Sequence, residues 1–170
     1  MTEPQDPFTV AINFVLPEEG GYTDDPRDKG KATNFGIDQR SHPNVDIRHL
    51  TRDGAIEIYH TDYWLKNRCD QLPLPLAVMH FDTCVNEGGG EGAKLLQEAV
   101  GVTVDGYIGS KTLAAAQAAN QADAVTEYAA HRMVAYGRIA SFPTYGFGWS
   151  RRLMACHRLC LSLVTPCPAP

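Results

Sequence analysis

The stretch that most constrains the fold is residues 76–85, which would be apolar on most sides of a helix. Such a helix cannot lie at the surface, because it needs other elements against nearly every face. Pro73 and Pro75 precede it, and the glycines at 88–90 interrupt the pattern after it. The sequence therefore predicts a central helix with other helices around it.

The rest of the chain supplies helices that can surround this one. Asp6 before Pro7 is typical of a helix start. One apolar face then follows at helical spacing, formed by Phe8, Ala11, Ile12, Val15 and Leu16. Further helices are predicted at 51–66, 91–100, 110–119, 122–140 and 153–164. Residues 20–46 carry many glycine and proline turns and predict a loop with a short hairpin. The sequence thus predicts a mainly α protein of about seven helices with one small β element.

The chain of 170 residues is expected to form a single domain over 1–165, with a flexible tail at 166–170. No proline-, serine- or glycine-rich linker separates a first part, 6–88, from a helical second part, 89–165. The first part alone would bury too little apolar surface to be stable.

Charge and cysteine content exclude several classes of protein. A formal net charge of -5 argues against a general nucleic-acid binder. No stretch reaches the ~20 apolar residues of a membrane span, and no basic region opens the chain as in a Sec signal. The five cysteines are an odd number, so no disulfide framework is expected.

We expect no metal and no cofactor. Cys156-His157-x-x-Cys160 has the form of half a metal site, but it falls within an apolar helical pattern and is more simply a pair of core thiols. The six histidines show no His-x-x-x-His pair and no cysteine at ligand spacing, which disfavours zinc amidase chemistry.

Glu19 is the candidate catalytic residue. It continues the apolar face of the first helix, where a poorly hydrated carboxyl has a raised pKa and can protonate a glycosidic oxygen. Gly20 and Gly21 would allow backbone and sugar to approach closely. A second carboxylate is needed, and Asp24, Asp25 and Asp28 follow in the next loop. Alternatively, Glu19 is a solvated residue at a helix end that the two glycines terminate. The neighbouring Glu18, which leaves the apolar face, is expected to be solvated in this way.

Three ordered motifs resemble glycoside hydrolase family 108, the bacterial and phage N-acetylmuramidases. They are Glu19-Gly-Gly-Tyr22, Asp25-Pro-x-Asp28-x-Gly30 and Ala32-Thr-Asn-x-Gly-Ile37. The segments Phe81–Asn86 and Leu96–Gly109 resemble the family's second half, a predicted peptidoglycan-binding region. The chain departs from the family at Lys31, where a glycine is common.

The resemblance implies a lysozyme-like α+β fold and makes Glu19 the proton donor. A looser likeness to the phage-type lysozymes of family 24 implies Asp28 as second carboxylate and Thr33 or Asn34 as the residue that positions water. The predicted substrate-binding residues are Gly20, Gly21, Tyr22, Asn34, Asp82 and Asn86.

Several of these residues have a second interpretation. Asp82 and Asn86 either line the cleft or form a buried, hydrogen-bonded pair that ties helices together. Tyr22 is expected to stack on sugar, whereas core packing is expected for most of the other candidate aromatic residues, which are Trp64, Tyr145, Phe147 and Trp149. The last helix has a basic side with Arg151, Arg152 and Arg158, which fits either an anionic lipid contact or an ordinary packed terminal helix.

The predicted function is cleavage of the β-1,4 bond between N-acetylmuramic acid and N-acetylglucosamine. The alternatives are a lytic transglycosylase and a non-catalytic peptidoglycan-binding or secretion-assisting protein. The expected partner is cell-wall peptidoglycan, with no nucleic acid, no stable membrane insertion and a monomeric state. We expect synthesis in the bacterial or host cytoplasm and action in the periplasm or cell wall, as for a phage-like endolysin.

Overall fold

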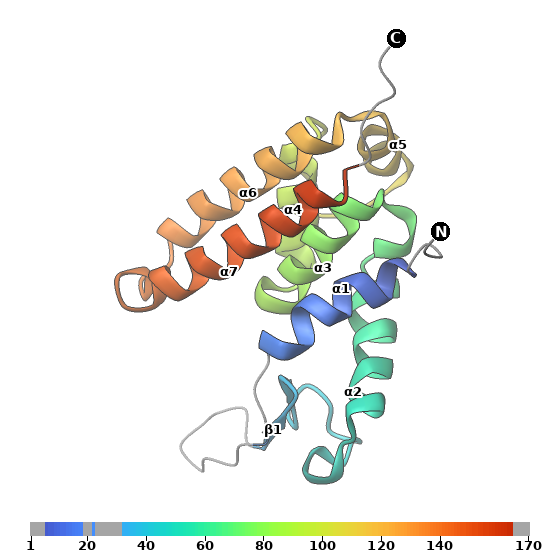
Figure 1. The fold of residues 1–170 in the computed structure, drawn as a ribbon, viewed down its shortest axis with the longest axis vertical. Helices are drawn as coiled ribbons and strands as arrows, with labels where there is room; N and C mark the ends of the chain where they lie inside the picture. The colour runs from blue at the N-terminus through green and yellow to red at the C-terminus, as the bar shows by residue number, and fades with distance from the viewer. Residues whose placement is uncertain (1–5, 19–21, 23–31, 165–170) are drawn as a thin grey trace.

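The computed structural model describes residues 6–18, 22 and 32–164 (Figure 1). Its α-helices are α1 (Pro7–Val15), α2 (Arg52–Ile58), α3 (Leu74–Glu87), α4 (Gly89–Ala99), α5 (Ser110–Ala118), α6 (Gln121–Gly137) and α7 (Phe142–Ser162). Strands β1 (Thr33–Asn34) and β2 (Ile37–Asp38) form one antiparallel pair. A π-helical segment, Tyr59–Leu65, continues α2, and single 3-10 turns lie at Leu16–Glu18, Ile47–His49 and Cys69–Gln71. The predicted mainly α fold with a small β element is confirmed.

Helix α3 is the centre of the molecule. Every residue from Pro75 to Cys84 is buried, and α1, α4, α6 and α7 all pack against the helix. In Figure 1, α3 lies behind α1 and beside the long pair formed by α6 and α7. The helix predicted to need partners on nearly every side therefore has them.

Side-chain caps fix where several helices begin. Asp6 accepts a hydrogen bond from the backbone N–H of Thr9 at 2.9 Å, and Thr51 accepts one from Gly54 at 3.1 Å. Each cap satisfies a backbone donor that the first helical turn leaves without a partner. Behind the first cap, Ala11, Ile12 and Val15 are buried as the apolar spacing predicts.

The hairpin is short and firmly attached. Phe35 and Gly36 connect its strands with φ values of 50° and 74°. Two such residues make the tight turn that suits a two-residue hairpin loop, and glycine adopts this geometry without strain. The buried amide of Asn34 donates to the carbonyl oxygens of Ile47 and Leu50 at 3.2 and 3.3 Å. The Tyr59 hydroxyl donates to Phe35 O at 2.9 Å. The hairpin is thus tied to the segment that follows it.

Two helices differ from their prediction. Helix α7 begins at Phe142, far ahead of Leu153, because Pro143 suits a first helical turn and Gly146 accepts the Phe142 ring against its backbone. The predicted helix at 51–66 changes to π geometry at Tyr59, which brings residues five apart, such as Tyr59 and Trp64, onto one buried face. Among the described residues, no helix combines the length and apolar character needed to cross a bilayer.

Candidate active site

Helix α1 and the 3-10 turn after it lead the chain to the predicted catalytic residue. Glu19, Gly20, Gly21 and Asp28 lie outside the described residues, so their roles stay predictions. Val15 and Leu16 are buried, and α1 packs on α3. The apolar face that we expected to support Glu19 is therefore buried from Ala11 to Leu16 and partly buried at Phe8.

The described residues of the first motifs have different surroundings. Tyr22 is 40% exposed, and Nε of Arg48 donates to its hydroxyl at 3.4 Å. Thr33 is half-buried on β1, opposite Asp38. Asn34 is only 7% exposed, with its amide nitrogen bonded to two carbonyl oxygens. Tyr22 and Thr33 thus retain exposed surface, whereas the placement of Asn34 favours a structural role over contact with sugar or water.

Asp82 lies in a buried ionic cluster of four side chains. Its Oδ2 is 2.6 Å from Nη1 of Arg132 on α6, and its Oδ1 is 2.9 Å from Nε of Arg152 on α7. Nε of Arg132 is also 2.6 Å from Oε1 of Glu87, the last residue of α3. The cluster therefore joins α3 to α6 and α7 by charge-assisted hydrogen bonds.

Burial makes the charges in this cluster depend on one another. Burial lowers the pKa of Arg132, but the carboxylates of Asp82 and Glu87 outweigh it and raise that pKa above its usual value. Burial raises the pKa of Glu87, against the opposing effect of Arg132. Removing either sign would leave the other charge buried without a counter-charge, which costs far more than an exposed pair.

Of the two interpretations of Asp82 and Asn86, these contacts favour the structural one. The Asp82 side chain is 0% exposed, and each of its oxygens receives a guanidinium, so neither oxygen faces a sugar. Asn86 lies one turn later and donates to the Asp82 carbonyl oxygen at 2.6 Å, but the residue itself is exposed. Asn86 can therefore reach a ligand, whereas Asp82 acts through the helices that it ties together.

Arg132 was not among the predicted functional residues, and Arg152 was predicted on the wrong side of its helix. Arg152 was grouped with Arg151 and Arg158 on a basic side, yet it points inward to Asp82. A signal was present for Arg132, since it falls on the same helical face as the apolar Val125, Ala129 and Tyr136. A charged residue on an apolar face requires a buried counter-charge, and Asp82 is the matching residue.

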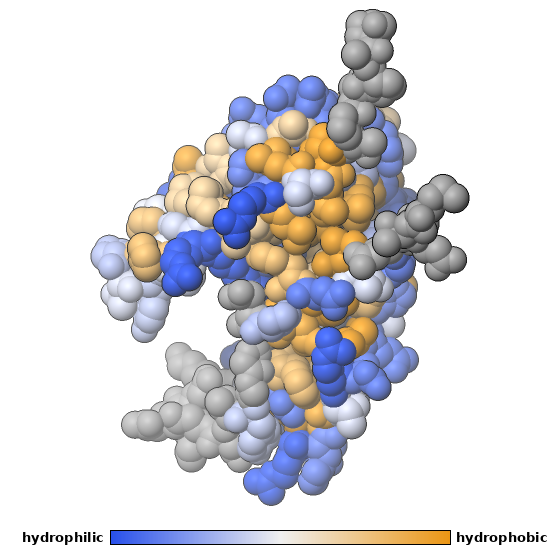
Figure 2. Space-filling model, viewed as in Figure 1, coloured by the Kyte–Doolittle hydropathy of each residue, from blue (hydrophilic) through white to orange (hydrophobic). Residues whose placement is uncertain are grey.

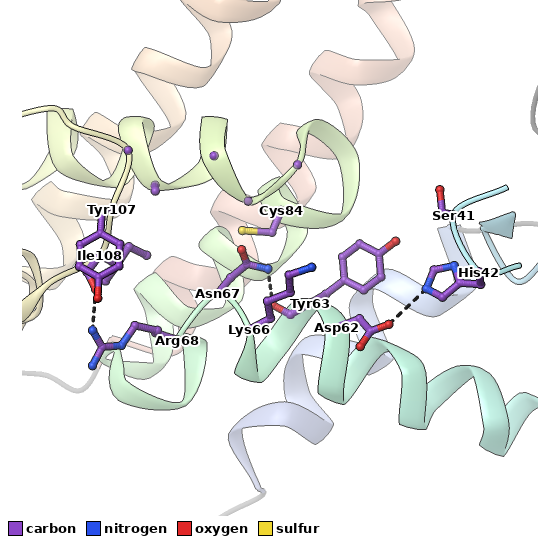
Figure 3. Close-up of a pocket in the computed structure, with 15 residues that line it drawn as sticks. Ser41, His42, Asp62, Tyr63, Lys66, Asn67, Arg68, Cys84, Tyr107 and Ile108 are labelled. Atoms are coloured by element: carbon purple, nitrogen blue, oxygen red, sulfur yellow. Dashed lines mark hydrogen bonds and ion pairs between the residues drawn. The ribbon is translucent and has the colours of Figure 1, made fainter. Parts of the chain in front are cut away.

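A cavity of about 520 Å³ lies between the hairpin side, the π-helical segment, the start of α4 and the 106–108 loop (Figure 3). Most of its labelled side chains are polar. Nε2 of His42 contacts Oδ2 of Asp62 at 3.3 Å across one end. At the other end, Nη1 of Arg68 donates to Ile108 O at 2.6 Å. Between them, the Lys66 side chain also lines the cavity.

Glycine forms one wall of this cavity. Gly88, Gly89 and Gly90 line it, and the space where a Cβ of Gly88 or Gly90 would lie is open. A ligand can therefore approach the backbone at the start of α4, where amide N–H groups precede the first helical hydrogen bonds. A cavity with polar side chains and accessible backbone donors suits a hydroxyl- and amide-rich ligand such as a saccharide.

Aromatic residues gather where α6 connects to α7. The rings of Tyr136, Phe142 and Tyr145 all lie within 6.2 Å of the Trp149 ring, with Tyr145 stacked on it at 27°. Tyr145 is 59% exposed and Phe147 79% exposed, so the prediction that these two pack in the core was wrong. We had predicted that the last helix begins near Leu153, so the sequence pattern did not show on which side of α7 Tyr145 and Phe147 lie. The core prediction holds for Trp64, which is 3% exposed.

His80 and Cys84 correct another prediction. They are one helical turn apart on α3, and the Cys84 sulfur lies 3.5 Å from Nε2 of His80, so a histidine does have a cysteine at ligand spacing. The Tyr128 hydroxyl lies 2.9 Å from Nδ1 of the same ring. Burial lowers the pKa of His80 to about 4 and raises that of Cys84. Within the described ranges, no third ligand completes a metal site.

The described thiols of the Cys156-His157-x-x-Cys160 motif are both buried, as core residues would be. A hydrogen bond with Cys160 and burial raise the pKa of Cys156, which keeps that thiol protonated. His157 instead contacts the hydroxyl of Thr126 on α6 at 3.0 Å. In the part of the chain that the structure describes, this motif is therefore a pair of core thiols beside an inter-helix hydrogen bond.

Comparisons with known proteins agree with this arrangement. The family model of glycosyl hydrolase 108 matches residues 12–88, and that of a predicted peptidoglycan domain matches residues 91–154. A solved structure described as that of Brucella abortus SagA is similar, with 31% identity and a TM-score of 0.82. The alignment covers 95% of this chain and 98% of that one. A comparison with curated proteins gave no match.

The two matched segments define a glycoside hydrolase with a peptidoglycan-directed second part. The chain belongs to the glycosyl hydrolase 108 family. The boundary between the matched segments falls at the glycines between α3 and α4, which also line the cavity of Figure 3.

Proposed function

We propose that this protein is an N-acetylmuramidase, which hydrolyses the β-1,4 bond between N-acetylmuramic acid and N-acetylglucosamine in peptidoglycan. The single observation that carries the proposal is the glycosyl hydrolase 108 match over residues 12–88, which includes Glu19 and the motifs after it. The peptidoglycan match over 91–154 supports the choice of substrate.

Glu19 is proposed as the general acid that protonates the leaving oxygen. Support comes from α1, whose apolar face is buried against α3 and directs the chain toward this residue. A general acid needs a carboxyl that is protonated near neutral pH, and poor hydration raises the pKa of a carboxyl in that direction. Asp28 is proposed as the second carboxylate, and Thr33 as the residue that positions water, beside the hairpin turn.

The cavity of Figure 3 is proposed to hold part of the glycan strand. Its glycine wall and polar lining allow hydrogen bonds from backbone and side chains to sugar hydroxyl and acetamido groups. Titration with a chitin oligosaccharide, followed by NMR, should shift the amide signals of Gly89 and Gly90 before those of α5. Unchanged signals at these glycines under saturating sugar would remove the cavity from the proposal.

The reaction itself is tested on purified sacculi, with mass spectrometry of the released products. Hydrolysis leaves a reducing muramic acid, a lytic transglycosylase leaves the anhydro form, and a binding protein releases nothing. The proposal requires the reducing product. It also requires the protein to reach the periplasm or cell wall, where its substrate lies.

Replacement of Glu19 tests the site. Glu19→Gln should reduce the rate by at least about a hundredfold, since a general acid contributes about 10²–10⁴-fold. The nearly isosteric amide should leave the melting temperature unchanged, and the matched control Glu18→Gln should retain most activity. Lysis by Glu19→Gln at the wild-type rate would show that the acid lies elsewhere.

The second carboxylate is tested by comparing three neighbouring loop aspartates. Asp28→Asn should lose more activity than Asp24→Asn or Asp25→Asn, because it has the spacing from Glu19 that the family 24 likeness implies. Equal and mild losses at all three positions would exclude a loop aspartate from that role.

A further inference from the structure

The outer face of α7 carries a continuous stripe of exposed side chains, formed by Phe147, Arg151, Met154, Arg158 and Leu161. Spacings of three and four residues place all five on one side of the helix. The three apolar members are 79%, 50% and 39% exposed, in chain order. The buried Leu153, Cys156 and Cys160 occupy the opposite side, so α7 has a packed face and a second, exposed amphipathic face.

Charge is distributed unevenly along the chain. All 20 acidic residues lie at or before Glu127, so the segment after it has none, although the formal net charge is -5. Two of the five arginines after Glu127, Arg132 and Arg152, are held by Asp82. Arg138, Arg151 and Arg158 are exposed, and no ion pair among the described residues engages them. The outer face of α7 is therefore a positive surface on an acidic protein.

The outer face of α7 also carries a groove. A shallow groove of about 480 Å³ runs along it, lined by Phe147, Ser150, Arg151, Met154, Ala155 and Arg158. Along the line that α7 follows in Figure 1, Figure 2 shows hydrophilic side chains beside hydrophobic ones. The groove places an apolar floor beside two guanidinium groups, which can extend toward an anionic surface while their stems stay on apolar atoms.

The positive charge of the outer face of α7 indicates which kind of partner can bind there. A second copy of this chain would set Arg151 and Arg158 against their own counterparts, because they alternate with the apolar residues of the stripe. An anionic phospholipid surface accepts both features, since its headgroups pair with arginine and its acyl region takes up phenylalanine, methionine and leucine.

We propose that the outer face of α7 binds the surface of a membrane that contains anionic phospholipid. The helix would lie parallel to the membrane plane and would not cross it. This binding is separate from glycan cleavage, because the stripe points away from the packed side of α7 that holds Trp149, Arg152 and Asp82 in place. It would hold the enzyme next to the inner side of the cell wall.

The test is co-sedimentation of the full chain with vesicles of phosphatidylglycerol and phosphatidylcholine, and with vesicles of phosphatidylcholine alone. Only the anionic vesicles should bind the protein, and added salt should weaken binding. The double variant Arg151→Gln, Arg158→Gln should bind about thirtyfold more weakly, at about fivefold for each basic residue near an anionic surface. Phe147→Ser with Met154→Ser should also reduce binding.

Arg52→Gln with Val104→Ser is the matched control, since it removes one exposed arginine and one exposed apolar residue elsewhere. It should bind like the wild type, and all variants should digest detached sacculi equally. Failure to bind anionic vesicles, equal binding to neutral vesicles, or equal binding by all variants would overturn the proposal. The proposal would also be overturned if light scattering showed a dimer that the substitutions at Arg151, Arg158, Phe147 and Met154 abolish. Activity on detached sacculi tests the muramidase proposal independently.

Discussion

Two buried polar clusters lie on α3; one is formed by charged side chains and the other by neutral groups. Asp82 is ionic and is held by Arg132 and Arg152, whereas His80, two residues earlier, lies among neutral groups. Residues two apart project from nearly opposite sides of a helix, so the clusters face different neighbours. The comparison shows that a buried charge is kept where distant helices supply counter-charges, and that a titratable group without them is neutral.

Both clusters cross the boundary between the two family matches. His80 and Asp82 belong to the segment 12–88, while Tyr128, Arg132 and Arg152 belong to the segment 91–154. Neither segment by itself contains all the partners of its buried polar groups. These contacts support the expectation of a single domain over 1–165.

The largest effect should come from separating the segments. A fragment of residues 1–89 should be insoluble or should lack a cooperative thermal transition by circular dichroism, because α3 would lose α4, α6 and α7 and Asp82 would lose both arginines. A fragment of residues 1–165 is the control and should melt like the whole chain. A soluble, cooperatively melting and lytic 1–89 fragment would restore a two-module organisation.

The next largest effect should come from Asp82→Asn. This change removes the carboxylate that Arg132 and Arg152 share and should lower the free energy of unfolding by about 3–5 kcal/mol in urea denaturation. The exposed Asp70→Asn is the control and should have little effect. The quadruple change Asp82→Leu, Glu87→Gln, Arg132→Met, Arg152→Met, which removes all four charges of the cluster, should recover much of the loss. An unchanged free energy of unfolding in Asp82→Asn would contradict the claim that the cluster stabilises the packing of α3 against α6 and α7.

The neutral cluster predicts a smaller, pH-dependent effect. The pKa of His80 is about 4 in the folded state, below its usual 6.5, so its contribution is complete above about pH 6.5 and is lost as pH falls toward 4. The loss should be about 2 kcal/mol between pH 7.5 and pH 5, and on the order of 3 kcal/mol by pH 4. Thermal melts across this range measure it.

A substitution separates His80 from other groups that titrate in the same range. His80→Gln should be less stable than the wild type at neutral pH, yet it should lose less stability on acidification. His49→Gln, at an exposed position, should keep the wild-type profile. Parallel profiles for the wild type and His80→Gln would show that His80 is not the group responsible.

The sequence predicted the parts of the fold that local signals determine. Asp6, Thr51 and the glycines after α3 mark boundaries through local chemistry, and the apolar stretch at 76–85 required a central position. It did not predict which arginine meets Asp82, because that choice depends on how α6 and α7 approach α3 in space. Tyr145 and Phe147 were misjudged because the start of α7 fixes which side of the helix each occupies.

In the candidate site too, the sequence predicted the features that local motifs determine and missed those that depend on the packing of distant segments. Thr33, Tyr22 and the hairpin follow from motif and turn chemistry; the structure places Thr33 on β1 and the Tyr22 hydroxyl against Arg48, in the segment after the hairpin. The cavity of Figure 3 was not predicted, because it is formed by four segments far apart in the sequence. Asn34 was assigned to substrate because its neighbours are functional in the family, although its amide holds the hairpin in place.

The complete burial of α3 has a consequence for the dynamics of the protein. Amide protons in a helix covered by four others exchange with solvent only when those helices separate. The slowest exchange in the molecule should therefore be found between Pro75 and Cys84, and its rate should follow the opening of the whole fold. The hairpin and the outer turns can open and close many times while this helix stays closed to water.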